Sequence, residues 1–110
     1  MKPAIHAKDV SILAALADPI RLEIVKRLSK VREITGVELA RSLGISRALL
    51  CHHAGILVEA GVATRRKAGQ TGYLRLNASP LHRCIKKLAV RSVNRPAGRP
   101  RMGRKSRAPR

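Results

Sequence analysis

The sequence predicts one small α+β domain, mainly α-helical with one β-hairpin, whose elements follow the order ααααββα. Three observations predict this fold class. The chain has 110 residues, 45% of them apolar, which suits a single folded domain. Apolar residues recur at helical spacing in five segments. A glycine-containing turn over 69–71 separates two strand-like segments, 62–67 and 72–76.

The first two helices are predicted from apolar spacing and from one capping sequence. A helix over 9–16 is indicated by apolar residues three positions apart, namely Val10, Leu13 and Leu16. Asp18 and Pro19 open a second helix, because Asp accepts a backbone N–H at the N-cap and Pro suits the first helical position. The apolar face expected for this helix consists of Leu22, Val25 and Leu28, with Ile24 beside it.

The third and fourth helices are predicted on either side of a glycine turn. Thr35 and Glu38 have the spacing of a capping box, and Gly44 ends the helix because glycine tolerates the left-handed conformation. Ser46 can cap a fourth helix that runs to about residue 60. Ala40 is small enough for two helices to cross closely, and the core between them is expected to contain Leu39, Leu43, Ile45 and Leu50. This pattern is typical of a helix-turn-helix, although any helical hairpin with a glycine turn shares part of it.

The hairpin follows the fourth helix directly and carries positive charge. Its first strand contains Arg65, Arg66 and Lys67, and its second strand contains Arg75. A helix-turn-helix followed by such a hairpin has the element order of a winged helix. The alternative is a solvated hairpin whose charge serves solubility, but the absence of any acid after Glu59 favours an anionic partner.

The last helix is followed by a change in composition. A Ser-Pro pair at 79–80 opens a helix that is expected to end near Val93. Its inward residues are expected to be Leu81, Ile85 and Leu88. From residue 94 onward the chain has seven basic residues, three prolines and two glycines, which cannot bury enough apolar surface to fold. The sequence therefore predicts a folded domain over 7–93 and a disordered basic tail over 94–110.

The charge balance indicates the class of partner. The chain has 24 Lys and Arg against 6 Asp and Glu, a formal net charge of +18. A basic surface gains free energy when it releases counterions condensed on a polyanion. No apolar run approaches the ~20 residues of a membrane-spanning helix, and the N-terminus lacks the apolar core of a signal peptide. We therefore expect a nucleic acid partner, no membrane, and a cytoplasmic, nucleoid-associated protein.

Four segments carry a resemblance to a known family. Residues 15–25 read ALADPIRLEIV, and residues 37–46 read VELARSLGIS. Residues 51–62 read CHHAGILVEAGV, and residues 73–77 read YLRLN. Together they resemble the segments LADPTRLxIL, ELAxxLGLS, SHHLxxLxxAGLV and YYRLN of the ArsR/SmtB family of bacterial and archaeal repressors. The resemblance implies a homodimeric winged helix, joined through its first and last helices, that acts as an autoregulated repressor.

The chain departs from this family where many members bind metal. The family's Cys-x-Cys site at the start of the third helix corresponds here to 33–37, which contains no thiol or imidazole. The last helix offers only His82 and Cys84, which are two residues apart and do not share a helical face. The residues at 51–53, Cys-His-His, point about 100° apart and do not converge on one ion. No metal and no cofactor are predicted, and the two cysteines are expected to be free thiols.

The predicted DNA contacts lie on the fourth helix and the hairpin. Arg47 is expected to contact guanine O6 and N7, with a phosphate contact as the alternative. His53 is expected nearer the core, whereas Cys51 is expected to face the groove, where its oxidation would add bulk. The full predicted set is Ser46, Arg47, Ala48, Leu49, Cys51, His52, Arg65, Arg66, Lys67, Gln70, Thr71 and Arg75. The predicted dimer interface consists of Val10, Leu13, Leu16, Leu81, Ile85 and Leu88.

These features predict a sequence-specific regulator of transcription that binds double-stranded DNA, and a repressor in particular. It is expected to bind an inverted repeat as a homodimer through helix 46–60 and the wing over 63–76. No paired carboxylates and no glycine-rich phosphate loop are present, so an enzyme is not predicted. Two alternatives stay open, an RNA- or ribosome-associated winged helix and a sequence-neutral architectural protein. Single-strand recognition is disfavoured, because the single tyrosine cannot build a stacking platform.

We expect the basic tail to add DNA affinity that does not depend on base sequence. Each phosphate neutralised on duplex DNA contributes about −0.9 to the slope of log K against log salt. A chain that ends at residue 93 should keep its site preference but show a shallower salt dependence than the full chain. Binding titrations at several salt concentrations measure the two slopes, and equal slopes would contradict the prediction.

Overall fold

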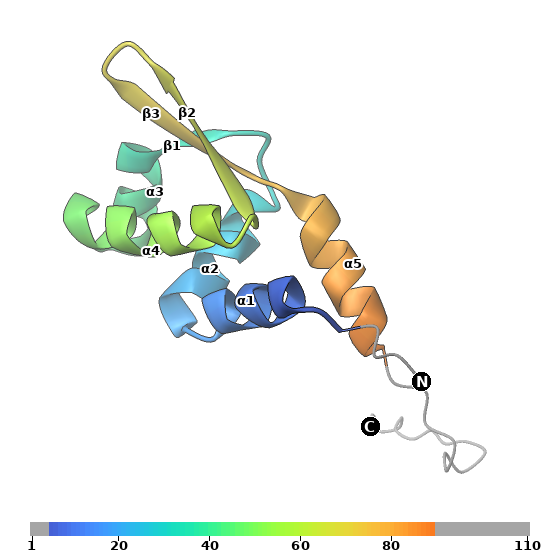
Figure 1. Ribbon diagram of the computed structural model, residues 1–110. Coiled ribbons are helices and arrows are strands. Elements are labelled where there is room, and N and C mark those ends of the chain that lie inside the picture. The colour runs from blue at the N-terminus through green and yellow to red at the C-terminus, as the bar shows by residue number, and fades with distance from the viewer. Residues whose placement is uncertain (1–4, 90–110) are drawn as a thin grey trace, which may run out of the picture.

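The computed structural model describes residues 5–89 as five helices and a three-stranded antiparallel sheet (Figure 1). The elements in chain order are α1 (Ala7–Leu16), α2 (Pro19–Leu28), β1 (Ile34–Thr35), α3 (Gly36–Leu43), α4 (Arg47–Glu59), β2 (Ala63–Ala68), β3 (Thr71–Leu76) and α5 (Ala78–Leu88). The predicted fold class is confirmed. The predicted tail over 94–110 and the last residues of the predicted domain lie outside the described residues.

The sheet contains one strand that the sequence did not predict. The strand order is β1-β3-β2, and β1 pairs with β3 through Ile34 opposite Leu74 and Thr35 opposite Tyr73. A two-residue strand has no alternation pattern of its own, so only its distant partner β3 defines it. The hairpin turn is also shorter than predicted, because Thr71 already pairs with Ala68.

The predicted caps of α2, α3 and α4 are confirmed. The Asp18 carboxylate accepts hydrogen bonds from the backbone N–H groups of Ile20 and Arg21, at 2.8 and 3.0 Å. Thr35 Oγ1 accepts from the backbone of Glu38 at 3.1 Å, and Ser46 Oγ accepts from Leu49 at 3.0 Å. Gly44 ends α3 with φ of 69°, in the left-handed region that favours glycine. These local contacts fix where each helix begins and ends.

The apolar core lies between the helices and one face of the sheet, with α4 in contact with α1, α2, α3 and β2. The fully buried large side chains are Ile12, Ile24, Leu28, Leu39, Leu50, Leu57, Val62 and Cys84. Leu39, Leu43, Ile45 and Leu50 belong to the core or pack against it, as predicted. Within residues 5–89, no helix is both long enough and apolar enough to cross a bilayer.

The predicted inward faces of α2 and α5 are wrong in part, and on α1 the buried residues differ from those whose spacing predicted the helix. On α1 the buried residues are Asp9, Ile12 and Ala15, whereas Val10 and Leu13 are exposed. On α2, Leu22 is exposed and Ile24 takes its place with Leu28. On α5, Leu81 and Cys84 are buried, whereas Ile85 and Leu88 are exposed. Each of these short helices offers more than one apolar stripe, and spacing alone does not say which stripe meets the core. Helix α5 also begins at Ala78, after the N-cap Asn77, and not at the Ser-Pro pair at 79–80, and it ends at Leu88, earlier than predicted.

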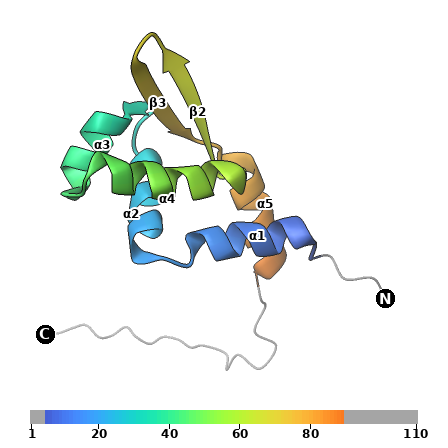
Figure 2. The same ribbon diagram turned by 60° about the vertical axis from the view of Figure 1, so that its left-hand side comes forward.

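Helix α5 crosses α1 and contacts it near its N-terminal end (Figures 1 and 2). Lys87 Nζ donates to Asp9 Oδ2 at 2.9 Å, and the Cys84 thiol donates to the backbone oxygen of Asp9 at 3.7 Å. The backbone N–H of His6 and the Lys87 ammonium both hold the pKa of Asp9 below its ordinary value. This carboxylate therefore ties the N-terminal end of α1 to the last turn of α5.

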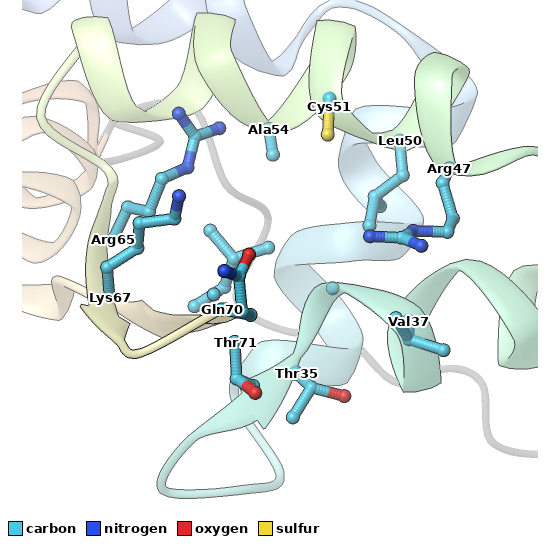
Figure 3. A pocket seen from close by; sticks show the side chains of 13 residues that line it. Thr35, Val37, Arg47, Leu50, Cys51, Ala54, Arg65, Lys67, Gln70 and Thr71 are labelled. Carbon is cyan, nitrogen blue, oxygen red and sulfur yellow. The ribbon is translucent and has the colours of Figure 1, made fainter.

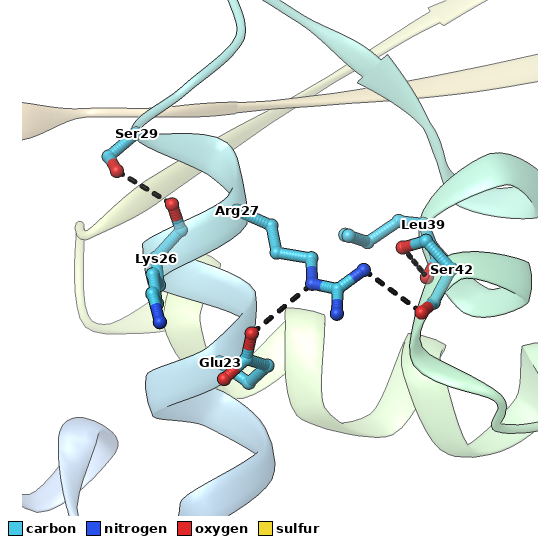
Figure 4. A network of polar contacts seen from close by, with 6 residues as sticks. All are labelled: Glu23, Lys26, Arg27, Ser29, Leu39 and Ser42. Carbon is cyan, nitrogen blue, oxygen red and sulfur yellow. Dashed lines mark hydrogen bonds and ion pairs between the residues drawn. The ribbon is translucent and has the colours of Figure 1, made fainter.

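Helix α2 is attached to the end of α3 by Arg27 (Figure 4). Its Nη1 donates to the backbone oxygen of Ser42 at 2.9 Å, and its Nε donates to Glu23 at 3.2 Å. The Ser42 oxygen belongs to the last turn of α3, where carbonyl groups lack helical partners. Arg27 therefore satisfies one such carbonyl and fixes α3 against α2.

Two glycines are expected to respond oppositely to the same substitution. A Cβ added at Gly55 in α4 would meet no atom within 4 Å, so this glycine does not serve a close helix contact. We expect Gly55→Ala to stabilise the protein by about 0.5–1 kcal/mol, because alanine loses less backbone entropy in a helix. Gly44→Ala, the matched control, should destabilise it by about 1–2 kcal/mol through its left-handed backbone. Urea unfolding measures both values, and a destabilising Gly55→Ala would contradict this interpretation.

Candidate nucleic-acid interface

Helices α3 and α4 form the predicted helix-turn-helix. Leu39 and Leu50 are buried between them, and Ala40 is only 3% exposed where the helices cross. The turn is closed by a hydrogen bond from the backbone N–H of Ile45 to the oxygen of Ala40, at 3.1 Å. The buried residues fix α4 from one side, which leaves its N-terminal half free on the other.

The exposed side of α4 carries the residues that the sequence predicted for DNA contact. All six of them are exposed, namely Ser46, Arg47, Ala48, Leu49, Cys51 and His52. His53 is buried, as predicted, and its Nδ1 lies 3.0 Å from Nη1 of Arg21. Because a guanidinium can only donate, His53 Nδ1 accepts this hydrogen bond. The contact with His53 joins the start of α2 to α4. Arg21 also donates to the backbone oxygen of Ala15, which joins the start of α2 to α1.

A cleft of about 490 Å³ separates α4 from the hairpin (Figure 3). Its apolar wall includes Leu50, Ala54 and Leu74, whereas Arg47, Arg65, Lys67, Gln70 and Thr71 supply its polar groups. Figure 3 shows Arg65 and Lys67 extending from the hairpin toward α4, and Cys51 pointing from α4 into the cleft. Within residues 5–89, the three cations of the cleft make no ion pair with a carboxylate. The cleft therefore presents uncompensated positive charge.

The other predicted wing residues lie on the opposite face of the sheet. Strand pairing places Arg66 opposite Tyr73 and Arg75 opposite Thr64, so these side chains share the face away from α4. The Arg66 guanidinium donates two hydrogen bonds to Glu33, at 3.0 and 2.9 Å. The twelve predicted contact residues therefore do not form one continuous surface, and Arg66 is already paired.

Sequence reasoning missed two features of this region. Thr35, Gly36 and Val37 also line the cleft, because β1 brings the start of α3 beside the hairpin. Glu33 was not selected either, because nothing in its neighbouring sequence indicates that it lies beside Arg66, 33 positions away. Both features depend on the unpredicted pairing of β1 with β3.

The thiols and imidazoles of the described residues do not gather into a metal site. Within residues 5–89, no group of three or more His, Cys, Asp or Glu side chains lies close enough to hold an ion. Cys51 is an exposed free thiol and Cys84 is a buried free thiol, as predicted.

The predicted dimer residues divide into three groups by exposure. Val10, Leu13, Ile85 and Leu88 are exposed, with exposed fractions of 38–57%. Leu16 is half-buried, and Leu81 is buried within the protomer. Four of the six residues are therefore available at the surface of α1 and α5.

The arrangement defines a winged helix, with α4 as the exposed helix of a helix-turn-helix and the β2–β3 hairpin as its wing. Residues 18–65 match the model of a protein family described as "Bacterial regulatory protein, arsR family". The transcriptional repressor SdpR of Bacillus subtilis is 32% identical over 75 residues, which cover 68% of this chain and 82% of SdpR. The chain belongs to the ArsR family of regulatory proteins, which are transcriptional regulators and not enzymes.

Further similarities agree with this family. A protein from Halobacterium salinarum, described as an arsenical resistance operon repressor ArsR, is 38% identical to this chain over 69 residues, or 62% of this chain. The chain spans about half the length of that relative, 53%. The structure of HlyU from Vibrio cholerae matches with a TM-score of 0.65 and 32% identity, over 74% of this chain and 88% of HlyU. A solution structure from Mycobacterium bovis, described as a homodimeric winged helix-turn-helix DNA-binding domain, matches with a TM-score of 0.64 and 21% identity, over 74% of each chain.

Proposed function

We propose that this chain binds double-stranded DNA at an inverted repeat as a homodimer and represses transcription there. The observation that carries the proposal is the cleft between α4 and the wing, which contains Arg47 from α4 and Arg65 and Lys67 from the hairpin. None of these three cations makes an ion pair with a carboxylate of residues 5–89. A phosphate backbone that entered this cleft would supply the missing negative charge.

The exposed end of α4 supports reading of the major groove. Arg47 is the first residue of the helix, where side chains of a recognition helix reach base edges. Its guanidinium can donate two hydrogen bonds to a guanine. Ala48 and Leu49 are exposed and apolar, which suits contact with thymine methyl groups. Ser46, Cys51 and His52 complete the surface that would face the groove.

The wing supports contacts to the sugar-phosphate backbone. Arg65 and Lys67 extend from β2 into the cleft toward α4, and Gln70 and Thr71 lie at the hairpin tip. A charged side chain in this position neutralises a phosphate without selecting a base. Arg75 lies on the other face of the hairpin, so we propose for it an outer phosphate contact.

The surface of α1 and α5 supports a homodimer. Val10, Leu13, Ile85 and Leu88 are large apolar residues that the protomer leaves exposed. A second copy would cover them and place two α4 helices for the two halves of an inverted repeat, one helical turn or a multiple apart. The homodimeric description of the Mycobacterium bovis domain supports this assembly. DNA binding of this kind would place the protein at the nucleoid, and no metal or cofactor is needed for it.

Selection from random duplex DNA by the full chain tests the proposal. We expect enrichment of an inverted repeat at physiological salt, together with a dimer by light scattering at micromolar concentration. Structured RNA that competed better than the selected duplex would favour an RNA-binding winged helix instead. Saturation without any enriched sequence would favour an architectural protein, and either result would overturn the proposal.

The contribution of the cleft can be tested with a matched pair of lysines. We expect Lys67→Gln to reduce the steepness of the salt dependence by about 0.9 for each protomer bound, since one phosphate contact is lost. Lys26→Gln, which removes the same charge from an exposed position on α2, should leave the slope unchanged. Titrations of the selected duplex at several salt concentrations give the slopes. Equal slopes for the two variants would show that Lys67 acts only through net charge.

A further inference from the structure

The outer face of the wing holds an ion pair that crosses the whole sheet. Arg66 Nε donates to Glu33 Oε2 at 3.0 Å, and Arg66 Nη2 donates to Oε1 at 2.9 Å. The guanidinium carbon also lies 4.5 Å from the centroid of the Tyr73 ring. Arg66 belongs to β2, Tyr73 belongs to β3, and Glu33 directly precedes β1. The contact therefore spans the strand order β1-β3-β2 from one edge to the other.

The pair joins the hairpin to the start of a strand that is itself short. The hairpin of β2 and β3 projects from the helical body (Figure 1), and β1 contributes only two residue pairs to the sheet. Among the ion pairs of the described residues, only the one between Arg66 and Glu33 involves the wing. A bidentate pair between a guanidinium and a carboxylate also fixes the relative orientation of the two groups, which a single contact does not.

The contact shifts the pKa of both groups in the direction that favours their charged forms. The hydrogen bonds from Arg66 hold the pKa of the Glu33 carboxyl below its ordinary value, and the charges of Arg66, Arg75 and Arg32 act in the same direction. The pKa of Arg66 is raised in turn, chiefly by the hydrogen bond to Glu33. Because the pKa of Glu33 is lower in the folded protein than in the unfolded chain, the ionised carboxylate stabilises the fold. This stabilisation is complete above the ordinary pKa of a glutamate and is lost as the pH falls through the lowered pKa of the folded state.

We propose that Glu33 positions the wing: its bidentate pair with Arg66, over the ring of Tyr73, fixes the hairpin relative to β1 and so sets how Arg65 and Lys67 face α4. Arg66 is then a positioning residue and not a phosphate contact. The effect on DNA affinity rests on the proposed function, whereas the effect on the wing itself does not.

For Glu33→Gln, the expected change in DNA affinity is opposite to the change that net charge alone would cause. Removing an acid from a chain of net charge +18 should strengthen its attraction to DNA. Glu59→Gln measures this purely electrostatic effect, because it removes the same charge from an exposed residue at the end of α4. Glu33→Gln should instead weaken binding, since the wing loses its fixed orientation.

The first experiment measures hydrogen exchange in the full chain without DNA. We expect Glu33→Gln to speed the exchange of β2 and β3 amides by about two- to fivefold, the range expected for loss of an exposed ion pair. Amides of α2 and α4 should not change, and Glu59→Gln should match the unaltered chain. Unchanged wing exchange in Glu33→Gln would overturn the proposal, whatever the DNA result.

An NMR titration of the Arg66 Nε–H resonance provides a readout specific to the pair. In the unaltered chain this resonance should shift as Glu33 takes up its proton, at a pH below the ordinary range for a glutamate. In Glu33→Gln the step should be absent. A resonance that showed the same titration in both chains would overturn the assignment of the pair.

The second experiment combines Glu33→Gln and Arg66→Gln in a double-mutant cycle on the selected duplex. We expect each single change to weaken binding by about three- to tenfold and the double variant to lose little more. Full additivity would show that Arg66 contacts phosphate directly and would overturn its positioning role. If the unaltered chain bound no duplex at all, the proposed function would fail, but the exchange result would still decide the role of Glu33 in the wing.

Discussion

The structure depends on the burial of one side of α4. Leu50, Ala54 and Leu57 are almost completely buried, and the helix contacts α1, α2, α3 and β2. Four elements are therefore placed by direct contact with this helix, whereas β1 is held by β3 and α3, and α5 is held by α1. Because a helix has two sides, the packing that holds α4 in the core also directs its other side outward. One side of α4 thus builds the core, and its other side forms part of the candidate nucleic-acid interface.

Three of the six acids of this basic chain make contacts that fix an element of the fold. Asp18 caps α2, Asp9 joins α1 to α5, and Glu33 joins the start of β1 to the wing. Within residues 5–89, none of these carboxylates pairs with the cations of the cleft. The consequence is a separation of roles among side chains of the same charge. Lys87 and Arg66 are bound internally, whereas Arg47, Arg65 and Lys67 keep their charge available for an external anion.

The segment that matches the arsR family contains most of the candidate nucleic-acid interface on α4. The arsR family description covers 18–65, which begins at the Asp18 cap and ends at Arg65 in the wing. That range includes the whole helix-turn-helix but stops before the hairpin tip and α5. The match therefore includes Glu33, Arg47 and Arg65, but it does not reach Arg66 or Lys67.

The sequence by itself determined the elements whose signals are local. The caps at Asp18, Thr35 and Ser46 and the left-handed turn at Gly44 involve residues within three positions of one another, so their spacing was sufficient. Only the tertiary structure decided which side of each helix is buried, because the helices α1, α2 and α5 carry apolar residues on more than one side. It alone also decided that β1 exists and that Arg66 faces Glu33. Those contacts join residues more than thirty positions apart, and no periodicity within a short window reports what a distant segment will supply.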